Sequence, residues 1–179
     1  MGQAIFQRVT ASVALLAAAL WLGGLVALGA ITAPIVFAVT PFPQSADAMT
    51  LVFRRFDLVA MSCAVLVLSG EAVRAAGRSR AAPFGRADWV RAGVCALAAA
   101  AAVGEGTLIS PRIAALHAVG AIRGVGAAGT ELSHLHDWAE RCGKTQVALL
   151  AALVVLSAWP AWQAWPGSPA RPRDRGAAS

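Results

Sequence analysis

The sequence predicts an all-α fold, a polytopic membrane protein built as a four-transmembrane-helix bundle with a short helical segment between helices three and four. Composition is the first reason, because 58% of the 179 residues are hydrophobic and 13% are charged, whereas soluble domains average about 45–50% apolar and about 25% charged residues. The second reason is the pattern of long apolar runs separated by short polar stretches. Runs of roughly 18 or more apolar residues are typical of transmembrane helices.

A chain of this length ordinarily forms one domain. We therefore expect a single four-helix transmembrane domain over residues 1–165. Residues 166–179 are rich in proline, arginine, glycine and alanine. A composition with so little apolar surface predicts a disordered tail, which the orientation argued below places in the cytoplasm.

The first span is expected at residues 9–39, a stretch without a charged residue. This run is about twice as long as the roughly 7–15-residue apolar core of a secretory signal, which favours a retained helix. A continuous helix of this length would measure ~46 Å, more than the ~30 Å hydrocarbon layer. The helix must therefore tilt, kink or emerge, and Pro34 is the expected kink because it lacks an N–H and clashes with the preceding turn.

The second span is expected at residues 55–76, after Pro41 and Pro43 end the first helix. Its apolar centre, residues 58–70, has charged residues at both ends. The next stretch, residues 77–88, is rich in arginine and glycine and contains a proline. This composition predicts a loop.

The third span is expected at residues 89–109, where alanine, valine and leucine predominate and Glu105 is the one acid. Pro111 then either breaks the helix or starts a new one in its first turn. Glycines interrupt residues 113–129 too often for a span, so a short helical segment followed by a loop is expected. The fourth span, residues 143–163, has a short apolar centre and must include polar residues on both sides.

The distribution of basic residues predicts that both termini lie in the cytoplasm. With that orientation nine arginines lie on the cytoplasmic side and six basic residues on the other, and the five arginines between Arg74 and Arg91 decide the difference. The cytoplasmic interface would then carry an aromatic belt of Trp89, Trp159, Trp162 and Trp165. The excess of arginine over lysine and the abundance of alanine suggest a GC-rich bacterial gene, and therefore the bacterial inner membrane.

The net charge of +6 could indicate a nucleic-acid partner. Because the basic residues lie between the apolar runs and in the tail, we interpret them as topology signals that contact lipid head groups. The lipid bilayer is therefore the expected partner, with no nucleic acid. No protein partner can be named from the sequence.

Small residues recur every four positions along the first span, at Ala19, Gly23 and Ala27, with Gly24 beside them. Small-x-x-x-small patterns let membrane helices approach closely. This stripe, Ala19–Gly23–Ala27, is a candidate contact with another helix or with a second copy of the chain, so a homo-oligomer through helix one is one expected assembly.

Two acids near span ends, Glu71 and Glu105, are candidates for a role beyond topology, since acids in hydrocarbon are costly and often functional. One interpretation is structural pairing with a basic residue such as Arg74 or Arg112. The other is a relay for protons or ions.

The histidines offer little support for a metal site. His134 and His136 are two residues apart, so on a helix their side chains point roughly 200° away from each other and cannot share an ion. His117 is isolated in the sequence, and Cys63, Cys95 and Cys142 form no C-x-x-C pair. Phosphate-loop, zinc-protease and nucleophile-elbow motifs are also absent from the sequence. We assign no catalytic, cofactor-binding or metal residue, and we expect no enzymatic activity and no cofactor.

Short motifs along the chain carry a family resemblance. They are Trp21-Leu22-Gly23-Gly24, Ala33-Pro34-Ile35-Val36-Phe37, Phe53-Arg54-Arg55-Phe56, Ser110-Pro111-Arg112-Ile113 and Leu135-His136. Together, over about residues 14–156, the chain resembles the transmembrane protein 205-like family, also catalogued as domain of unknown function 4149. The resemblance implies a four-helix membrane domain without an established activity. The signature residues that it implies are Trp21, Gly23, Gly24, Pro34, Phe37, Pro111, Arg112 and His136.

Two hypotheses for function follow. The leading one is a structural or accessory membrane component. The alternative is a small-solute or metal-ion (copper-type) transporter or resistance protein, in which Glu105, Arg112 and His136 would line one polar cavity. The Trp-Leu-Gly-Gly opening is also similar to copper-resistance-D-type membrane proteins, whose histidine-rich segments this chain lacks. A membrane enzyme would require convergent acid and base groups, which the sequence does not offer.

Overall fold

The computed structural model describes residues 2–79 and 85–163, and every regular element in these two ranges is helical. The elements are α1 (Gly2–Val26), the π-helical segment η1 (Ala27–Thr32), α2 (Ala33–Val39), α3 (Gln44–Ser79), α4 (Arg86–Gly104), the π-helical segment η2 (Glu105–Ile109), α5 (Ser110–Ala118) and α6 (Gly126–Gln163). The predicted all-α fold is confirmed. The predicted tail and Trp165 lie outside the described residues.

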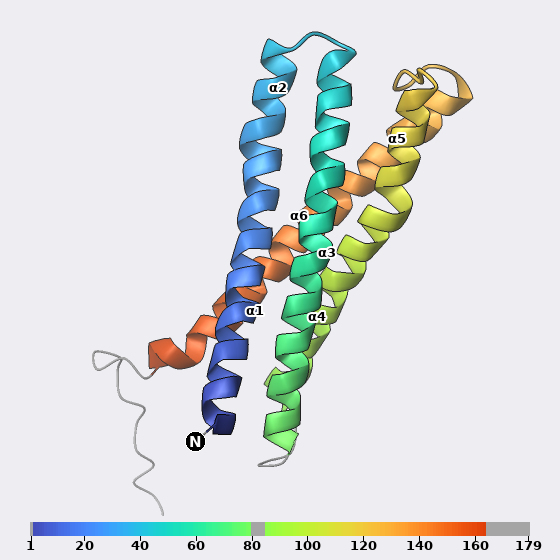
Figure 1. The fold of residues 1–179 in the computed structure, drawn as a ribbon. Helices are drawn as coiled ribbons and strands as arrows, with labels where there is room; N and C mark the ends of the chain where they lie inside the picture. Colours follow the sequence, from blue (N-terminus) through green and yellow to red (C-terminus); the bar gives the residue numbers. More distant parts are fainter. Residues whose placement is uncertain (1, 80–84, 164–179) are drawn as a thin grey trace, which may run out of the picture.

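These elements form four long helical rods (Figure 1). The first joins α1, η1 and α2, the second is α3, the third joins α4, η2 and α5, and the fourth is α6. Neighbouring rods run in opposite directions, so the α2–α3 and α5–α6 connections lie at one end of the molecule (Figure 1). The N-terminus and the last residues of α6 lie at the other end. α6 is inclined across the other rods and contacts both α1 and α4.

Each π-helical segment ends two residues before a proline. Pro34 lies in the first turn of α2 and Pro111 in the first turn of α5. Because a proline cannot donate its backbone nitrogen to the preceding turn and its ring clashes there, the helix widens locally rather than ending. The backbone keeps right-handed helical angles through Ala33 and Ser110.

The third rod is therefore longer than the sequence predicts. The expected third span ended at residue 109, with a separate helical segment after it, whereas the structure continues the helix through Pro111 to Ala118. α5 is the expected short segment, but it extends the third rod. Gly120 and Gly124 lie in the turn after α5 and Gly126 is the first residue of α6, and all three adopt positive φ.

Three helical stretches in the described residues are long and apolar enough to cross a membrane: Ile5–Val39, Arg86–Ala118 and Gly126–Ala158. The predicted second span lies inside α3, which carries charged residues along much of its length. Large apolar side chains are exposed on the outside of the rods, among them Leu16, Leu20, Leu97 and Leu108. An apolar exterior of this extent is typical of a protein surrounded by lipid.

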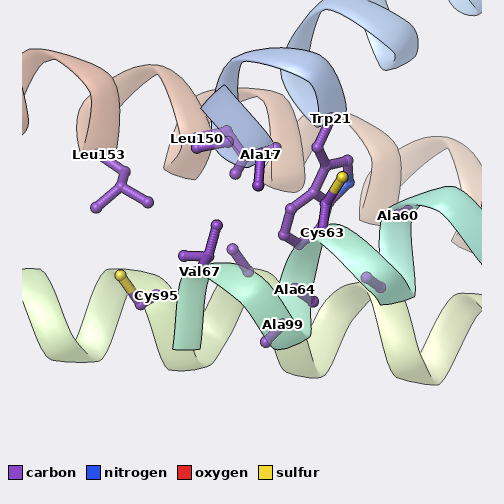
Figure 2. Packing of buried hydrophobic residues seen from close by; sticks show 13 residues of the cluster. Ala17, Trp21, Ala60, Cys63, Ala64, Val67, Cys95, Ala99, Leu150 and Leu153 are labelled. Carbon is purple, nitrogen blue, oxygen red and sulfur yellow. The ribbon is translucent and has the colours of Figure 1, made fainter. Parts of the chain in front are cut away.

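The core consists largely of small residues, with seven alanines and two cysteines among thirteen members. Small side chains let membrane helices pack closely, and Trp21 is the one large aromatic residue in this layer (Figure 2). The members are Ala17, Ala18, Trp21, Ala60, Cys63, Ala64, Val67, Cys95, Ala98, Ala99, Ala102, Leu150 and Leu153.

The close contact between α1 and α3 uses glycines outside the predicted stripe. A Cβ at Gly70 would lie 2.5 Å from the Cβ of Ala14, and a Cβ at Gly24 would lie 2.2 Å from the Phe56 ring. The Ala19–Gly23–Ala27 stripe is exposed instead, and a Cβ at Gly23 would meet nothing within 4 Å. Among the described residues, the stripe therefore lies on the outside of the bundle.

Candidate functional site

A polar network crosses the apolar core and joins three rods. The indole Nε1 of Trp21 on α1 donates to Oε1 of Gln146 on α6 over 3.0 Å, and Nε2 of Gln146 donates to Oε2 of Glu105 on η2 over 2.6 Å. Trp21 is 0% exposed and Gln146 is 1% exposed. An indole only donates and a carboxylate only accepts, so the amide between them must present its oxygen to Trp21 and its nitrogen to Glu105.

A second acid, Asp57 on α3, lies close to this network. Asp57 interacts electrostatically with Glu105, and the hydroxyl of Ser110 lies beside its carboxylate. Asp57 is 9% exposed, and its Oδ2 is buried without a hydrogen-bond partner among the described residues. The absence of a side chain at Gly106 permits this proximity, since a Cβ there would lie 3.3 Å from the Cβ of Asp57.

A hollow of about 350 Å³ opens beside Asp57. Arg54 interacts electrostatically with Asp57, and both Arg54 and Arg55 are exposed. The lining residues are Leu51, Arg54, Arg55, Asp57, Leu58, Met61 and Gly106. The hollow gives the acid at its wall a route toward the molecular surface.

A charged cluster lies between α3 and α4, toward the opposite end of α3. Glu71 and Asp88 are both buried. Nε of Arg74 donates to both oxygens of Glu71 at 2.8 Å, Nη1 of Arg74 donates to Asp88 at 2.8 Å, and Arg91 also binds Glu71. Two arginines thus balance two acids. The structure confirms Arg74 as the partner that the sequence suggested for Glu71.

Glu105 does not pair with Arg112, which was its suggested partner. Arg112 instead forms a two-point ion pair with Glu131, with Nε–Oε1 at 2.6 Å and Nη2–Oε2 at 3.0 Å. Both side chains of this pair are exposed to solvent. The continuation of helix three through Pro111 turns Arg112 toward α6 rather than toward the core.

His136 has a different neighbour again. Its Nδ1 lies 2.9 Å from the backbone oxygen of Leu132, and its ring stands edge-on to that of His117 at 5.9 Å between centroids. Glu105, Arg112 and His136 therefore have separate partners. The pairing of His117 with His136 was missed from the sequence, because it depends on α5 continuing helix three. Nowhere in residues 2–79 and 85–163 do three histidine, cysteine or acidic side chains gather as a metal group would.

Residues 16–122 match the family described as Domain of unknown function (DUF4149). This match spans more than half of the chain. The chain belongs to the DUF4149 family. No curated protein and no solved structure matches it.

The DUF4149 match includes most of the site and excludes one essential part. Trp21, Asp57 and Glu105 lie within the matched residues, whereas Gln146 lies beyond them on α6. The match also ends before the Leu135-His136 motif, so it is shorter than the resemblance over about residues 14–156.

Other signature residues of this DUF4149 chain lie at a helix contact, in the first turn of a helix or on the outer surface. Gly24 faces Phe56, Pro34 and Pro111 follow the two π-helical segments, and Phe37 is exposed on α2. Gly23 lies on the outside of α1.

Sequence reasoning missed Gln146 and Asp57 as site residues. Gln146 borders the apolar run of the fourth span, and an amide included in a membrane span is a signal for an interhelical hydrogen bond. Asp57 was placed at the end of a span that began at residue 55. Because α3 begins at Gln44, Asp57 lies more than three turns inside the helix.

Proposed function

We propose that this chain is a non-enzymatic, multi-pass protein of the bacterial inner membrane whose four-helix domain acts as a structural or accessory component. The observation that carries the proposal is the combination of three long apolar helical stretches with large apolar side chains exposed around them. The proposal includes the finer relationship to the transmembrane protein 205-like family, which the DUF4149 match supports at the level of an uncharacterised domain.

The proposed topology has four crossings with both termini in the cytoplasm. Its support is the placement of α3 alongside α1 and antiparallel to it (Figure 1). At ~1.5 Å per residue the 36 residues of α3 would measure ~54 Å, more than the ~30 Å hydrocarbon layer. The charged residues near both ends of α3 would then reach the head-group regions, and the arginine-rich α3–α4 connection would face the cytoplasm.

Single-cysteine labelling of the full chain tests this topology. In a background without Cys63, Cys95 and Cys142, we would introduce Gln44→Cys, Arg86→Cys and Val125→Cys separately and apply a membrane-impermeant maleimide to spheroplasts. We expect the first and third variants to be labelled from outside and the second only after permeabilisation. Labelling of positions 44 and 86 from the same side would remove α3 as a crossing helix and overturn the four-span arrangement.

A structural role is supported by the way charged side chains link the rods. Glu71 of α3 binds Arg91 of α4, and Arg74 of α3 binds Asp88 of α4. These ion pairs link α3 to α4, and they occupy the acids in binding the neighbouring helix. In addition, the exposed Ala19–Gly23–Ala27 stripe is available for a second copy of the chain, and we include a homo-oligomer in the proposal.

The alternative is a small-solute or metal-ion transporter or resistance protein. The proximity of His117 and His136 is the observation in its favour. Against it, Glu105, Arg112 and His136 bind different residues and do not bind one another. Growth and cellular metal content of a deletion strain, measured across a panel of metals and toxic compounds, separate the two functions. The accessory role predicts unchanged metal content, and a change restored by the wild-type gene would favour transport.

A further inference from the structure

Two neighbouring acids, one on α3 and one on η2, form no ion pair in the described residues. Asp57 on α3 and Glu105 on η2 interact with each other electrostatically. Neither belongs to any ion pair in the described parts of the chain. Toward the other end of α3, Glu71 and Asp88 are balanced by arginines. The bundle therefore binds Glu71 and Asp88 in ion pairs, whereas Asp57 and Glu105 form none among the described residues.

The hydrogen bonds to these two acids come from uncharged donors, which do not neutralise a carboxylate. Gln146 donates to Glu105 through a neutral amide, and Trp21 donates to Gln146 rather than to an acid. Oδ2 of Asp57 is buried and accepts no hydrogen bond from any described residue. Two like charges at short range in an apolar surrounding strongly disfavour full ionisation of both groups.

We propose that Asp57 and Glu105 together bind one exchangeable proton, which reaches them through the hollow beside Asp57. In this step a hydronium ion transfers its proton to a carboxylate oxygen. The oxygen lone pair forms a new O–H bond, one O–H bond of hydronium breaks, and water leaves. The pair then carries one negative charge instead of two. The buried Oδ2 of Asp57 is the natural acceptor, because it has no hydrogen-bond partner among the described residues.

The surroundings favour a proton over a metal ion. A metal cation such as Mg²⁺ or Ca²⁺ requires about six or more oxygen ligands, whereas the described residues include no group of three acids, histidines or cysteines that could hold one. In addition, Arg54 and Arg55 line the hollow and repel a divalent cation about twice as strongly as a singly charged hydronium ion. Water in a hollow of about 350 Å³ can still deliver a proton.

The groups that face the pair from each neighbouring element are compatible with this site. The one charged group among them is Arg54, which is exposed and interacts with Asp57. The others are uncharged at neutral pH. These groups are Trp21 from α1, Arg54 from α3, Ser110 from α5, and Cys142 and Gln146 from α6. The π-helical segment that carries Glu105 is also a helix form that occurs frequently at functional sites.

The test is carbodiimide labelling of the full-length protein in phosphatidylcholine–phosphatidylglycerol vesicles. Dicyclohexylcarbodiimide adds to a carboxyl group that carries its proton, and the adduct rearranges to a stable acylurea without loss of atoms. Peptide mass mapping should locate the label on Asp57 or Glu105. The labelling rate should fall about tenfold for each pH unit once the pair has released its proton.

Matched variants and salts make the outcome decisive. Asp57→Asn and Glu105→Gln should each remove most of the labelling, whereas Glu131→Gln should leave it unchanged. Circular dichroism in the same vesicles identifies any variant that fails to fold. If a variant does not fold, the position of the label and its pH dependence in the wild-type protein still test the proposal. Absence of label from both acids, or equal labelling of Glu71, would overturn the proposal. Protection by sodium chloride but not by choline chloride would also overturn it and assign the site to a sodium ion.

Discussion

At the scale of single residues, the bond between Trp21 and Gln146 explains how an indole can lie wholly inside an apolar bundle. Its N–H has no water to bind there, and an unpaired buried donor is costly. The oxygen of Gln146 satisfies it, and the amide nitrogen of the same residue is satisfied by Glu105. Each member of the network therefore depends on the next.

Replacement of Trp21 by phenylalanine tests this dependence. Trp21→Phe keeps an aromatic ring in the core but leaves Oε1 of Gln146 without its donor, so we expect a loss of about 1 kcal/mol of stability, the usual magnitude for an interhelical hydrogen bond in a membrane. Reversible unfolding in mixed micelles measures it. Trp138→Phe is the control, because Trp138 is exposed. Equal losses from the two variants would contradict the role given to the bond.

The charged residues offer a second comparison at this scale. Glu71→Gln leaves two arginines with one acid in a largely buried cluster, and breaking a buried ion pair costs about 3–5 kcal/mol. Glu131→Gln breaks a solvent-exposed pair, which is worth about 0–1 kcal/mol. The same unfolding measurement should show that Glu71→Gln is much less stable than Glu131→Gln. The reverse order would show that the cluster between α3 and α4 does not hold the helices together.

Sequence reasoning identified the residue types of the site better than their partners. It singled out Glu105 as an acid in an apolar run, and Trp21 through the family resemblance. It could not pair them, since the residue that joins them is 125 positions from Trp21 along the chain. It paired Glu71 with Arg74 correctly, because three residues along a helix place two side chains together.

At the scale of elements, the first and fourth rods end at the predicted residues 39 and 163, whereas the second and third end later than predicted, at Ser79 and Ala118. Pro111 was expected to break the third helix or start another, and the structure includes it in one rod through a π-helical segment. Pro111 does lie in the first turn of α5, as one of the two alternatives had it, but the pattern did not show that α5 continues the third rod. The same continuation explains why His117 reaches His136.

The contact between α1 and α3 gives a prediction for this scale. Gly70→Ala places a Cβ 2.5 Å from that of Ala14, so the helices must separate, and overpacking of this kind costs about 1–3 kcal/mol. Gly93→Ala is the matched control, because a Cβ there meets nothing within 4 Å and alanine favours helix by up to about 1 kcal/mol. Unfolding in mixed micelles should show opposite signs. A stabilised Gly70→Ala variant would contradict the close approach of the two helices.

At the scale of the whole molecule, composition alone was sufficient for the membrane assignment. The exposed leucines that composition predicts are found around the rods, and the all-helical fold follows from the need to satisfy backbone groups in lipid. The number of crossings was less accessible, because α3 combines an apolar centre with charges that pair inside the bundle. The crossing by α3 therefore stays a prediction, whereas the three other rods contain stretches long and apolar enough to cross a membrane.

Substitution of the two adjacent glycines of α1 tests whether the protein self-associates through this helix. Gly23 lies outside the bundle and Gly24 lies against Phe56. Gly23→Leu should weaken self-association in detergent, measured by energy transfer between labelled copies, while the unfolding midpoint stays near that of the wild type. Gly24→Leu should lower the midpoint instead, since its side chain would displace the Phe56 ring. Unchanged energy transfer in the Gly23→Leu protein would remove the stripe as an interface.

The position of Gln146 on α6 has a consequence for the DUF4149 region itself. A polypeptide ending at residue 122 would retain the indole and the carboxylate but would lack the amide that lies between them. Without it, each polar group would face hydrocarbon alone or admit water into the interior. The polar network that begins in the matched segment therefore becomes complete only when α6 packs against α1 and η2.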